Sequence, residues 1–206
     1  QVNNIRYRGS TARLFFILKD LPEIEGVNSN QMNTNFSICT SMESLEKASD
    51  GVKYGKISDT PFVDFNIPTI LNENFAINNQ HILAASVQYA PYHLRNQIWD
   101  DQTKSILKKN TMKVIENIIP NFSNLIESSY VLSPQDIENE FGLKEGNLNH
   151  GEMTLDQFMF MRPTISSSQY ATPIKNLYIC GGGTHPGGGL HGGNGYNAAK
   201  TILNKW

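Results

Sequence analysis

The sequence predicts an α/β protein of the α+β kind, in which a mixed β-sheet carries helices on one face. Three observations support this fold class. Short apolar or alternating runs outnumber long helical patterns in the first 150 residues. Hydrophobic residues make up 39% of the chain and charged residues 17%, so the chain can bury a core. Near the C-terminus, a glycine-dense segment lies between a strand pattern and a helix pattern.

Five runs in the first 150 residues are expected to form strands. Each is a compact apolar run or alternates between apolar and polar residues. The run that begins at Ala12, for example, reads A-R-L-F-F-I-L and ends at the turn Lys-Asp-Leu-Pro. The expected strands span residues 12–18, 36–40, 61–68, 81–89 and 125–132.

Three helices are expected in the same part of the chain. Two of them begin at a serine, Ser41 or Ser133, whose side chain can accept a hydrogen bond from the first helical turn. The longest helix is expected to stop at Pro120, because proline cannot continue a helix. The expected ranges are 41–52, 102–119 and 133–142.

Composition and charge exclude several classes of protein. The formal net charge of the 206 residues is −2, and binding to nucleic acid would need a concentrated basic face. No window approaches about 18 uninterrupted apolar residues, so no transmembrane segment is expected. Cys39 and Cys180 show no metal or redox spacing, so we expect a reduced, cytoplasmic setting, with association with a membrane surface left open. The chain does not begin with methionine, and we expect it to be the C-terminal part of a longer protein.

The glycine-dense segment is the most informative part of the sequence. Nine of the 16 glycines fall between Gly181 and Gly195. A buried strand is expected over residues 176–180 and a helix over residues 196–203, with small alanines that would let the helix pack on a sheet. Such an arrangement points backbone N–H groups and a helix N-terminus at an electron-rich ligand. The alternative is a loop that only turns sharply onto a sheet.

Four segments of the chain resemble motifs of one enzyme family. The first is L-Y-I-C-G-G-G-T-H-P-G-G-G-L-H-G-G-N-G-Y-N-A-A over residues 177–199. The others are G-N-L-N-H-G-E-M-T-L-D-Q, F-M-R-P and V-Q-Y-A-P-Y, over residues 146–157, 160–163 and 87–92. Together they resemble the phytoene desaturase and carotene ketolase group of FAD-dependent oxidoreductases, which includes the pyridine nucleotide-disulfide oxidoreductase domain proteins. The family's N-terminal G-x-G-x-x-G is absent from this sequence.

The resemblance implies a domain organisation and a cofactor. Residues 1–150 would be most of the substrate-binding domain, and residues 151–206 would supply the last strand, loop and helix of a Rossmann-like FAD domain. FAD would be bound by the full-length protein, together with the N-terminal FAD-binding half, and not by this chain alone. The cofactor-binding residues that the resemblance implies are Gly181, Gly182, Gly183, Thr184, Gly188, Gly189, Leu190, His191, Gly192 and Asn194.

Other polar and apolar side chains are candidates for catalysis and substrate binding. A carboxylate or imidazole beside the flavin could accept a proton while hydride leaves, and Glu152 and Asp156 would share a face if their stretch is helical. Alternatively, Asp156 and Arg162 form an ion pair that joins the domains, and the Met and Phe residues are plain core. No metal site is expected. The catalytic candidates are His191, Glu152 and Asp156, and the substrate candidates are Tyr89, Met159, Met161 and Arg162.

The resemblance implies dehydrogenation or oxidation of an apolar small molecule, of carotenoid or isoprenoid type, with hydride passing to flavin N5. This chain alone is expected to be inactive. Two alternatives stay open. One is a non-catalytic module that binds a partner chain or an apolar ligand without flavin, and the other is an amine oxidase-type flavoenzyme.

Overall fold

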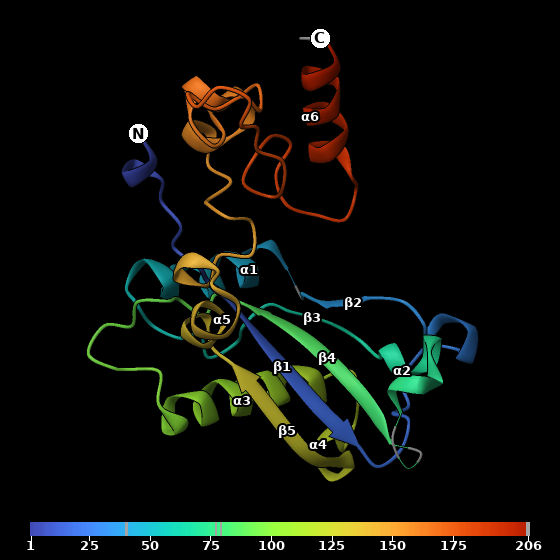
Figure 1. The fold of residues 1–206 in the computed structure, drawn as a ribbon. Helices are drawn as coiled ribbons and strands as arrows, with labels where there is room; N and C mark the ends of the chain where they lie inside the picture. The colour runs from blue at the N-terminus through green and yellow to red at the C-terminus, as the bar shows by residue number, and fades with distance from the viewer. Residues whose placement is uncertain (40, 77, 79, 205–206) are drawn as a thin grey trace.

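The computed structural model describes residues 1–39, 41–76, 78 and 80–204 (Figure 1). At its centre is a five-stranded sheet in the order β2-β3-β4-β1-β5. All four pairs of neighbouring strands are antiparallel, where a mixed sheet was expected, because hydrophobic periodicity does not reveal strand direction. The α+β class is confirmed. The strands are β1 (Thr11–Leu18), β2 (Phe36–Ile38), β3 (Val63–Asn66), β4 (His81–Gln88) and β5 (Ile126–Leu132).

All five strands predicted for the first 150 residues are therefore confirmed, with small differences at their ends. β3 is shorter than expected because Pro61 has no N–H to donate and Pro68 begins a helix. β2 ends at Ile38, and Thr40, which was expected to continue it, lies outside the described residues.

The three predicted helices and both serine caps are also confirmed. Ser41 Oγ accepts from Ser44 N (3.1 Å), and Ser133 Oγ accepts from Asp136 N (3.2 Å). The longest helix starts one residue earlier than expected because Asp100 caps it, accepting from Thr103 N at 2.8 Å. It ends at Glu116 with Asn117 as its C-cap, so the expected stop at Pro120 is wrong. Two one-turn helices, α2 and α4, were not expected. The helices are α1 (Met42–Lys53), α2 (Pro68–Leu71), α3 (Asp101–Glu116), α4 (Phe122–Leu125), α5 (Pro134–Phe141) and α6 (Gly193–Leu203).

The core lies between one face of the sheet and α3, which runs along that face in Figure 1. Every second residue of β1 is buried, and Phe16 packs edge to face on Phe122 at a ring-centroid distance of 5.2 Å. Leu107 and Ile115 of α3 are fully buried in the same cluster. The helix thus covers the buried face, as predicted.

The C-terminal part of the chain is built differently. In Figure 1 it lies above the sheet, and α6 lies farthest from the strands. The predicted buried strand over residues 176–180 is wrong, since the structure has only an isolated bridge between Ala171 and Tyr178, and Cys180 is exposed. Residues 170–172 pair with this segment only at that bridge, through the hydrogen bonds Thr172 N to Leu177 O and Ile179 N to Tyr170 O, and a strand needs pairing that continues over successive residues. For the same reason α6 does not pack on a sheet, and Ala199 is exposed.

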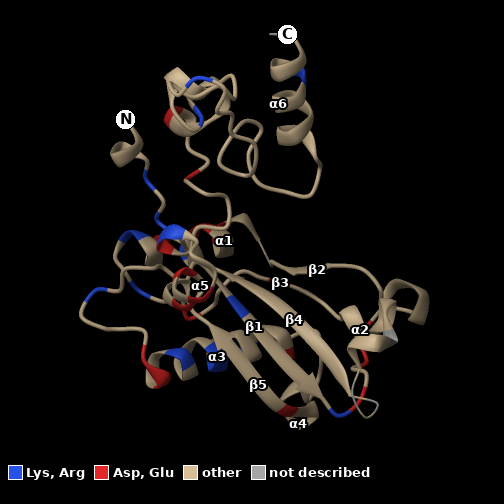
Figure 2. Cartoon of the chain, in the orientation of Figure 1, with Lys and Arg blue, Asp and Glu red and all other residues tan. Residues whose placement is uncertain are grey.

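Within the described residues, no helix has the length and apolar character needed to span a membrane. Lys and Arg residues, coloured blue in Figure 2, are spread over the described chain, and residues 181–195 include no Lys, Arg, Asp or Glu.

Candidate functional site

The glycine-rich segment, residues 181–195, is held in place by two buried side chains of its own. Thr184 Oγ1 donates to Gly181 O (2.8 Å). Asn194, in the first turn of α6, donates through Nδ2 to Gly181 O (2.8 Å) and Thr184 O (2.9 Å). These bonds join the start of the helix to the start of the loop. Thr184 and Asn194, both predicted to bind cofactor, therefore use their side-chain donors within the segment.

Part of the segment packs tightly against residues 149–153. A Cβ on Gly182 would lie 2.9 Å from His150 Cδ2, and one on Gly188 would lie 2.6 Å from Asn149 Oδ1. Atoms of this kind do not approach so closely, so a larger residue at either position would force the His150 or Asn149 side chain to move, and glycine permits the contact as it stands. The main chain does make close approaches here, as the glycines indicated, and one neighbour is the motif at residues 146–157.

Backbone conformation accounts for other glycines. Gly192 has φ 67° and is the N-cap of α6, and Gly189 has φ 118°. Side chains disfavour this region, which glycine enters freely. Gly181 also has positive φ.

Gly183 and Gly195 are different, because neither close packing nor backbone conformation requires them. A Cβ on Gly183 would meet only His150 Cβ at an ordinary distance of 3.7 Å, and one on Gly195 would meet no atom within 4 Å. Gly195 lies in the first turn of α6, where alanine would be favoured by about 1 kcal/mol. Within the described residues, nothing explains why these two positions carry glycine.

Leu190 and His191 form the exposed tip of the segment. Leu190 is fully exposed. His191 is also exposed, and its Nδ1 accepts a hydrogen bond from Gly193 N (3.0 Å). Since Nδ1 is the acceptor, the proton of the neutral ring lies on Nε2.

Arg162 lies buried between the glycine-rich segment and residues 149–157 and bonds to both. The residue is only 3% exposed. Its guanidinium donates to backbone carbonyls, including Gly182 O (3.1 Å), Glu152 O (3.2 Å) and Asn149 O. Burial lowers its pKa from the usual value for arginine. Among the described residues no carboxylate pairs with it, so the predicted ion pair with Asp156 is wrong.

Glu152 and Asp156 pair instead with the N-terminal segment. Arg6 Nη2 lies 2.6 Å from Asp156 Oδ2, and Arg6 Nε lies 3.3 Å from Glu152 Oε2. Arg8 Nη2 donates to the same Glu152 oxygen at 2.5 Å. The stretch is not an α-helix, so the two carboxylates meet through Arg6 and not on a helix face. We call the contacts between residues 6–9 and residues 145–157 the junction.

The arginines make both carboxylates weaker bases. The hydrogen bond from Arg8 lowers the pKa of Glu152, and the hydrogen bond from Arg6 lowers the pKa of Asp156. A carboxylate with a lowered pKa is a poor proton acceptor near neutral pH. Their geometry favours a structural role over proton transfer.

A first prediction follows from the charge of Glu152, whose side chain is 12% exposed. Because its folded pKa is lowered, its stabilising effect is complete above the ordinary pKa of about 4.3 and is lost as pH falls through the folded value. We expect Glu152→Gln to lower the free energy of unfolding by about 1–2 kcal/mol at pH 7, and by much less at about pH 3. Urea unfolding at both pH values measures this difference.

The control is Glu43→Gln, which removes an exposed i,i+4 pair with Lys47. That change should cost less than about 0.5 kcal/mol at either pH. An equal loss for Glu152→Gln at the two pH values would contradict the ionic character of the junction.

The four substrate candidates do not share one cavity. Met159 is 53% exposed and Phe160 is 71% exposed, so they are not plain core. Met159 lines a cavity of about 590 Å³ beside α6, together with His185, and Met161 lines a different one beside Arg6. Tyr89 follows the end of β4 and lines neither cavity, and Arg162 is enclosed by carbonyls.

Several residues of this region were not indicated by the sequence. Arg6 and Arg8 contact partners about 150 positions away, and no local pattern reports such a contact. Tyr170 is buried, and its hydroxyl donates to His185 O (2.8 Å) and accepts from Asn197 Nδ2 (2.9 Å). The described residues contain no group of three or more His, Cys, Asp or Glu side chains that could hold a metal ion.

Comparisons with known proteins identify relatives of the chain, although it matches no protein-family model. It is 38% identical over 160 residues to pyridine nucleotide-disulfide oxidoreductase domain-containing protein 2 of Rattus norvegicus, and 36% identical to the protein of that name from Mus musculus. The match covers 77% of this chain and 28% of each relative. Over 69 residues, 31% of this chain, it is 45% identical to a limonene dehydrogenase subunit of Castellaniella defragrans, covering 13% of that protein. A flavin-type oxidoreductase family therefore fits the chain.

Proposed function

We propose that the full-length protein is an FAD-dependent oxidoreductase of the phytoene desaturase and carotene ketolase-like group. In this proposal residues 1–150 are most of its substrate-binding domain, and the glycine-rich segment is part of its flavin site. The observation that carries the proposal is the pair Gly183 and Gly195, whose lack of side chains has no reason within the described residues. A ligand that touches the backbone supplies that reason. The oxidoreductase names of the relatives support the same class.

The chain's own residues fit an electron-rich ligand at this place. The first turn of α6 offers backbone N–H groups and the positive end of the helix dipole. The guanidinium of Arg162, which no described carboxylate neutralises, adds positive charge behind Gly182. Gly181, Gly182, Gly183, Gly188, Gly189, Leu190, His191 and Gly192 would line the cofactor, while Thr184 and Asn194 would hold the loop in shape.

When bound, FAD would accept hydride from the substrate. We propose an apolar substrate of isoprenoid type, and the name of the relative that is a limonene dehydrogenase subunit supports this class. Met159 and Phe160, both exposed beside α6, are apolar side chains that such a molecule could contact. The N-terminal half of the same protein would hold the rest of FAD.

The flavin content of the purified full-length protein tests this proposal. We expect the wild type to show flavin absorbance, and Gly195→Ala to retain at least about tenfold less flavin, because a methyl group would block close approach to the helix start. The same change should not reduce stability, since alanine is favoured in the helix by about 1 kcal/mol. Ser105→Ala, at an exposed position of α3, is the control and should keep full flavin. A wild type without flavin, or Gly195→Ala with full flavin, would overturn the proposal.

A further inference from the structure

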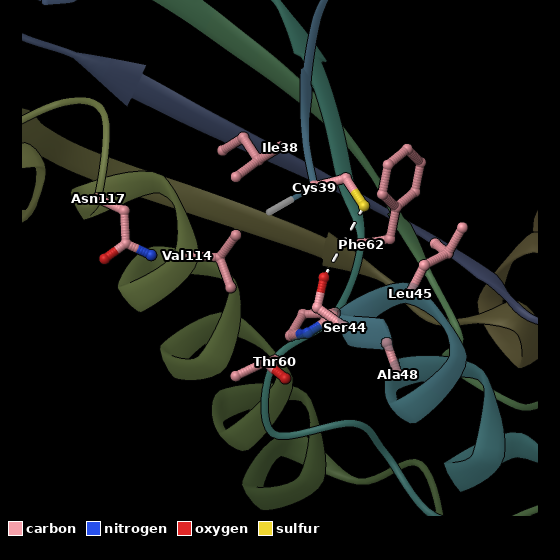
Figure 3. A pocket seen from close by; sticks show the side chains of 10 residues that line it. Ile38, Cys39, Ser44, Leu45, Ala48, Thr60, Phe62, Val114 and Asn117 are labelled. Atoms are coloured by element: carbon pink, nitrogen blue, oxygen red, sulfur yellow. Dashed lines mark hydrogen bonds between the residues drawn. The ribbon is translucent and has the colours of Figure 1, made fainter. Parts of the chain in front are cut away.

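A second candidate site lies on the buried side of the sheet, apart from the glycine-rich segment. It is a cavity of about 270 Å³ between β2, α1, the chain before β3, and α3 (Figure 3). Its apolar wall is formed by side chains from all four elements, and none of its lining residues belongs to the glycine-rich segment or the junction. The apolar residues that the argument uses are Ile38, Leu45, Ala48, Phe62 and Val114.

The polar groups of this cavity are few and uncharged. No Lys, Arg, Asp or Glu is among its lining residues. Ser44 Oγ is already used, because it donates to Ser41 O at 2.7 Å. Thr60 and Asn117 are exposed residues of the lining, so they place a hydroxyl and an amide on its solvent side. A ligand with an apolar body and one hydrogen-bonding group matches this arrangement, whereas a charged ligand would find no partner.

The size of the cavity limits the ligand further. An apolar cavity of about 150 Å³ holds a benzene molecule, which has six non-hydrogen atoms. A cavity of about 270 Å³ therefore has room for about eight to twelve such atoms.

We propose that this cavity binds an uncharged, mainly apolar molecule of about eight to twelve non-hydrogen atoms with a single hydroxyl or carbonyl group. The apolar body lies against Leu45, Ala48 and Val114, and the polar group bonds to the amide of Asn117. The site does not use the flavin, so its occupation is independent of the function proposed above.

Cys39 provides a reporter for this site. Its side chain lies in the cavity wall, with Sγ 3.9 Å from Ser44 Oγ (Figure 3). Cys180 is also exposed and lies outside the cavity, so it serves as an internal reference. The full-length protein is treated with iodoacetamide, with and without octanol, and alkylation of each cysteine is followed by peptide mass spectrometry.

At an octanol concentration of about ten times its Kd, only about one cavity in ten is unoccupied. We therefore expect alkylation of Cys39 to slow about tenfold. Alkylation of Cys180 should not change. Ala48→Phe, which fills the cavity, should remove the effect of octanol. Met42→Phe is the matched control, because Met42 is an exposed residue of α1 outside the cavity, and it should preserve the effect.

A second variant keeps the proposal testable should Ala48→Phe not fold. Asn117→Leu removes the amide at the solvent side and should weaken octanol about fivefold, the factor that one hydrogen bond of about 1 kcal/mol contributes. No slowing at Cys39, equal slowing at Cys180, full slowing in Ala48→Phe, or octanol affinity in Asn117→Leu equal to that of the wild type would each overturn the proposed site.

Discussion

Replacing Arg162 with methionine is expected to lower the free energy of unfolding by about 3 kcal/mol, measured by urea denaturation. Methionine keeps much of the apolar volume but removes every donor. The carbonyls of Asn149, Glu152 and Gly182 then lose their partner in a site that is 3% exposed. Each buried carbonyl that lacks a donor costs about 1–3 kcal/mol. Water that enters the site would bond to some of the three carbonyls, so the total loss stays near about 3 kcal/mol.

A second variant separates the shape of the guanidinium from its charge, and a third variant is the control. Arg162→Lys keeps the charge but cannot reach several carbonyls at once, so we expect about half of the loss. Arg95→Met removes an exposed arginine and should change stability by less than about 0.5 kcal/mol. If Arg162→Lys were as stable as the wild type, positive charge alone would suffice and the described hydrogen bonds would not matter.

Gly9→Ala is expected to be comparably destabilising, by about 3 kcal/mol, for a steric reason. A Cβ on Gly9 would lie 2.0 Å from Glu145 O and 2.8 Å from Gly146 C. Both are backbone atoms, so no side-chain rotation relieves the clash and the two segments of the junction must separate. Urea unfolding measures the loss, and faster proteolysis within residues 145–157 should accompany it.

The matched control for this variant is Gly195→Ala. Neither Gly9 nor Gly195 has a positive φ, so alanine meets no left-handed backbone strain at either position, but a Cβ on Gly195 meets no atom within 4 Å. Only the crowded position should lose stability. Equal stability of the two variants would show that residues 9 and 145 do not approach as closely as described.

The sheet could be predicted from the sequence because its signals are local. β1 was predicted from the compact apolar run A-R-L-F-F-I-L, and every second residue of the strand is buried. The caps at Ser41 and Ser133 depend only on the next three residues. Strand direction and strand order depend on which distant segments pair. Residues 176–180 have a strand-like sequence but pair with residues 170–172 only at one isolated bridge, so their sequence alone was misleading.

The candidate site was predicted only in part, because some of its signals are local in the sequence and others depend on contacts between distant segments. A cluster of glycines indicates close approach of the backbone, and Gly182 and Gly188 do make such approaches. Which surface they approach is a tertiary property, and here it includes His150 and Asn149. The partner of Asp156 was wrongly predicted because spacing favoured the nearby Arg162 over Arg6, which is 150 residues away in sequence.

The long sequence separation across the junction has a consequence for the order of assembly. Closing it directly from the unfolded chain would bring together Arg6 and Glu152, 146 positions apart. Once β1 pairs with β5, Arg13 already lies opposite Leu132, and fewer than about 30 residues remain to be closed. The entropic cost falls by about 1.5 kcal/mol, so the sheet should assemble first. In native-state amide hydrogen exchange, the Glu152 amide, which donates to Arg6 O, should therefore open more readily than the amides of β1 and β4.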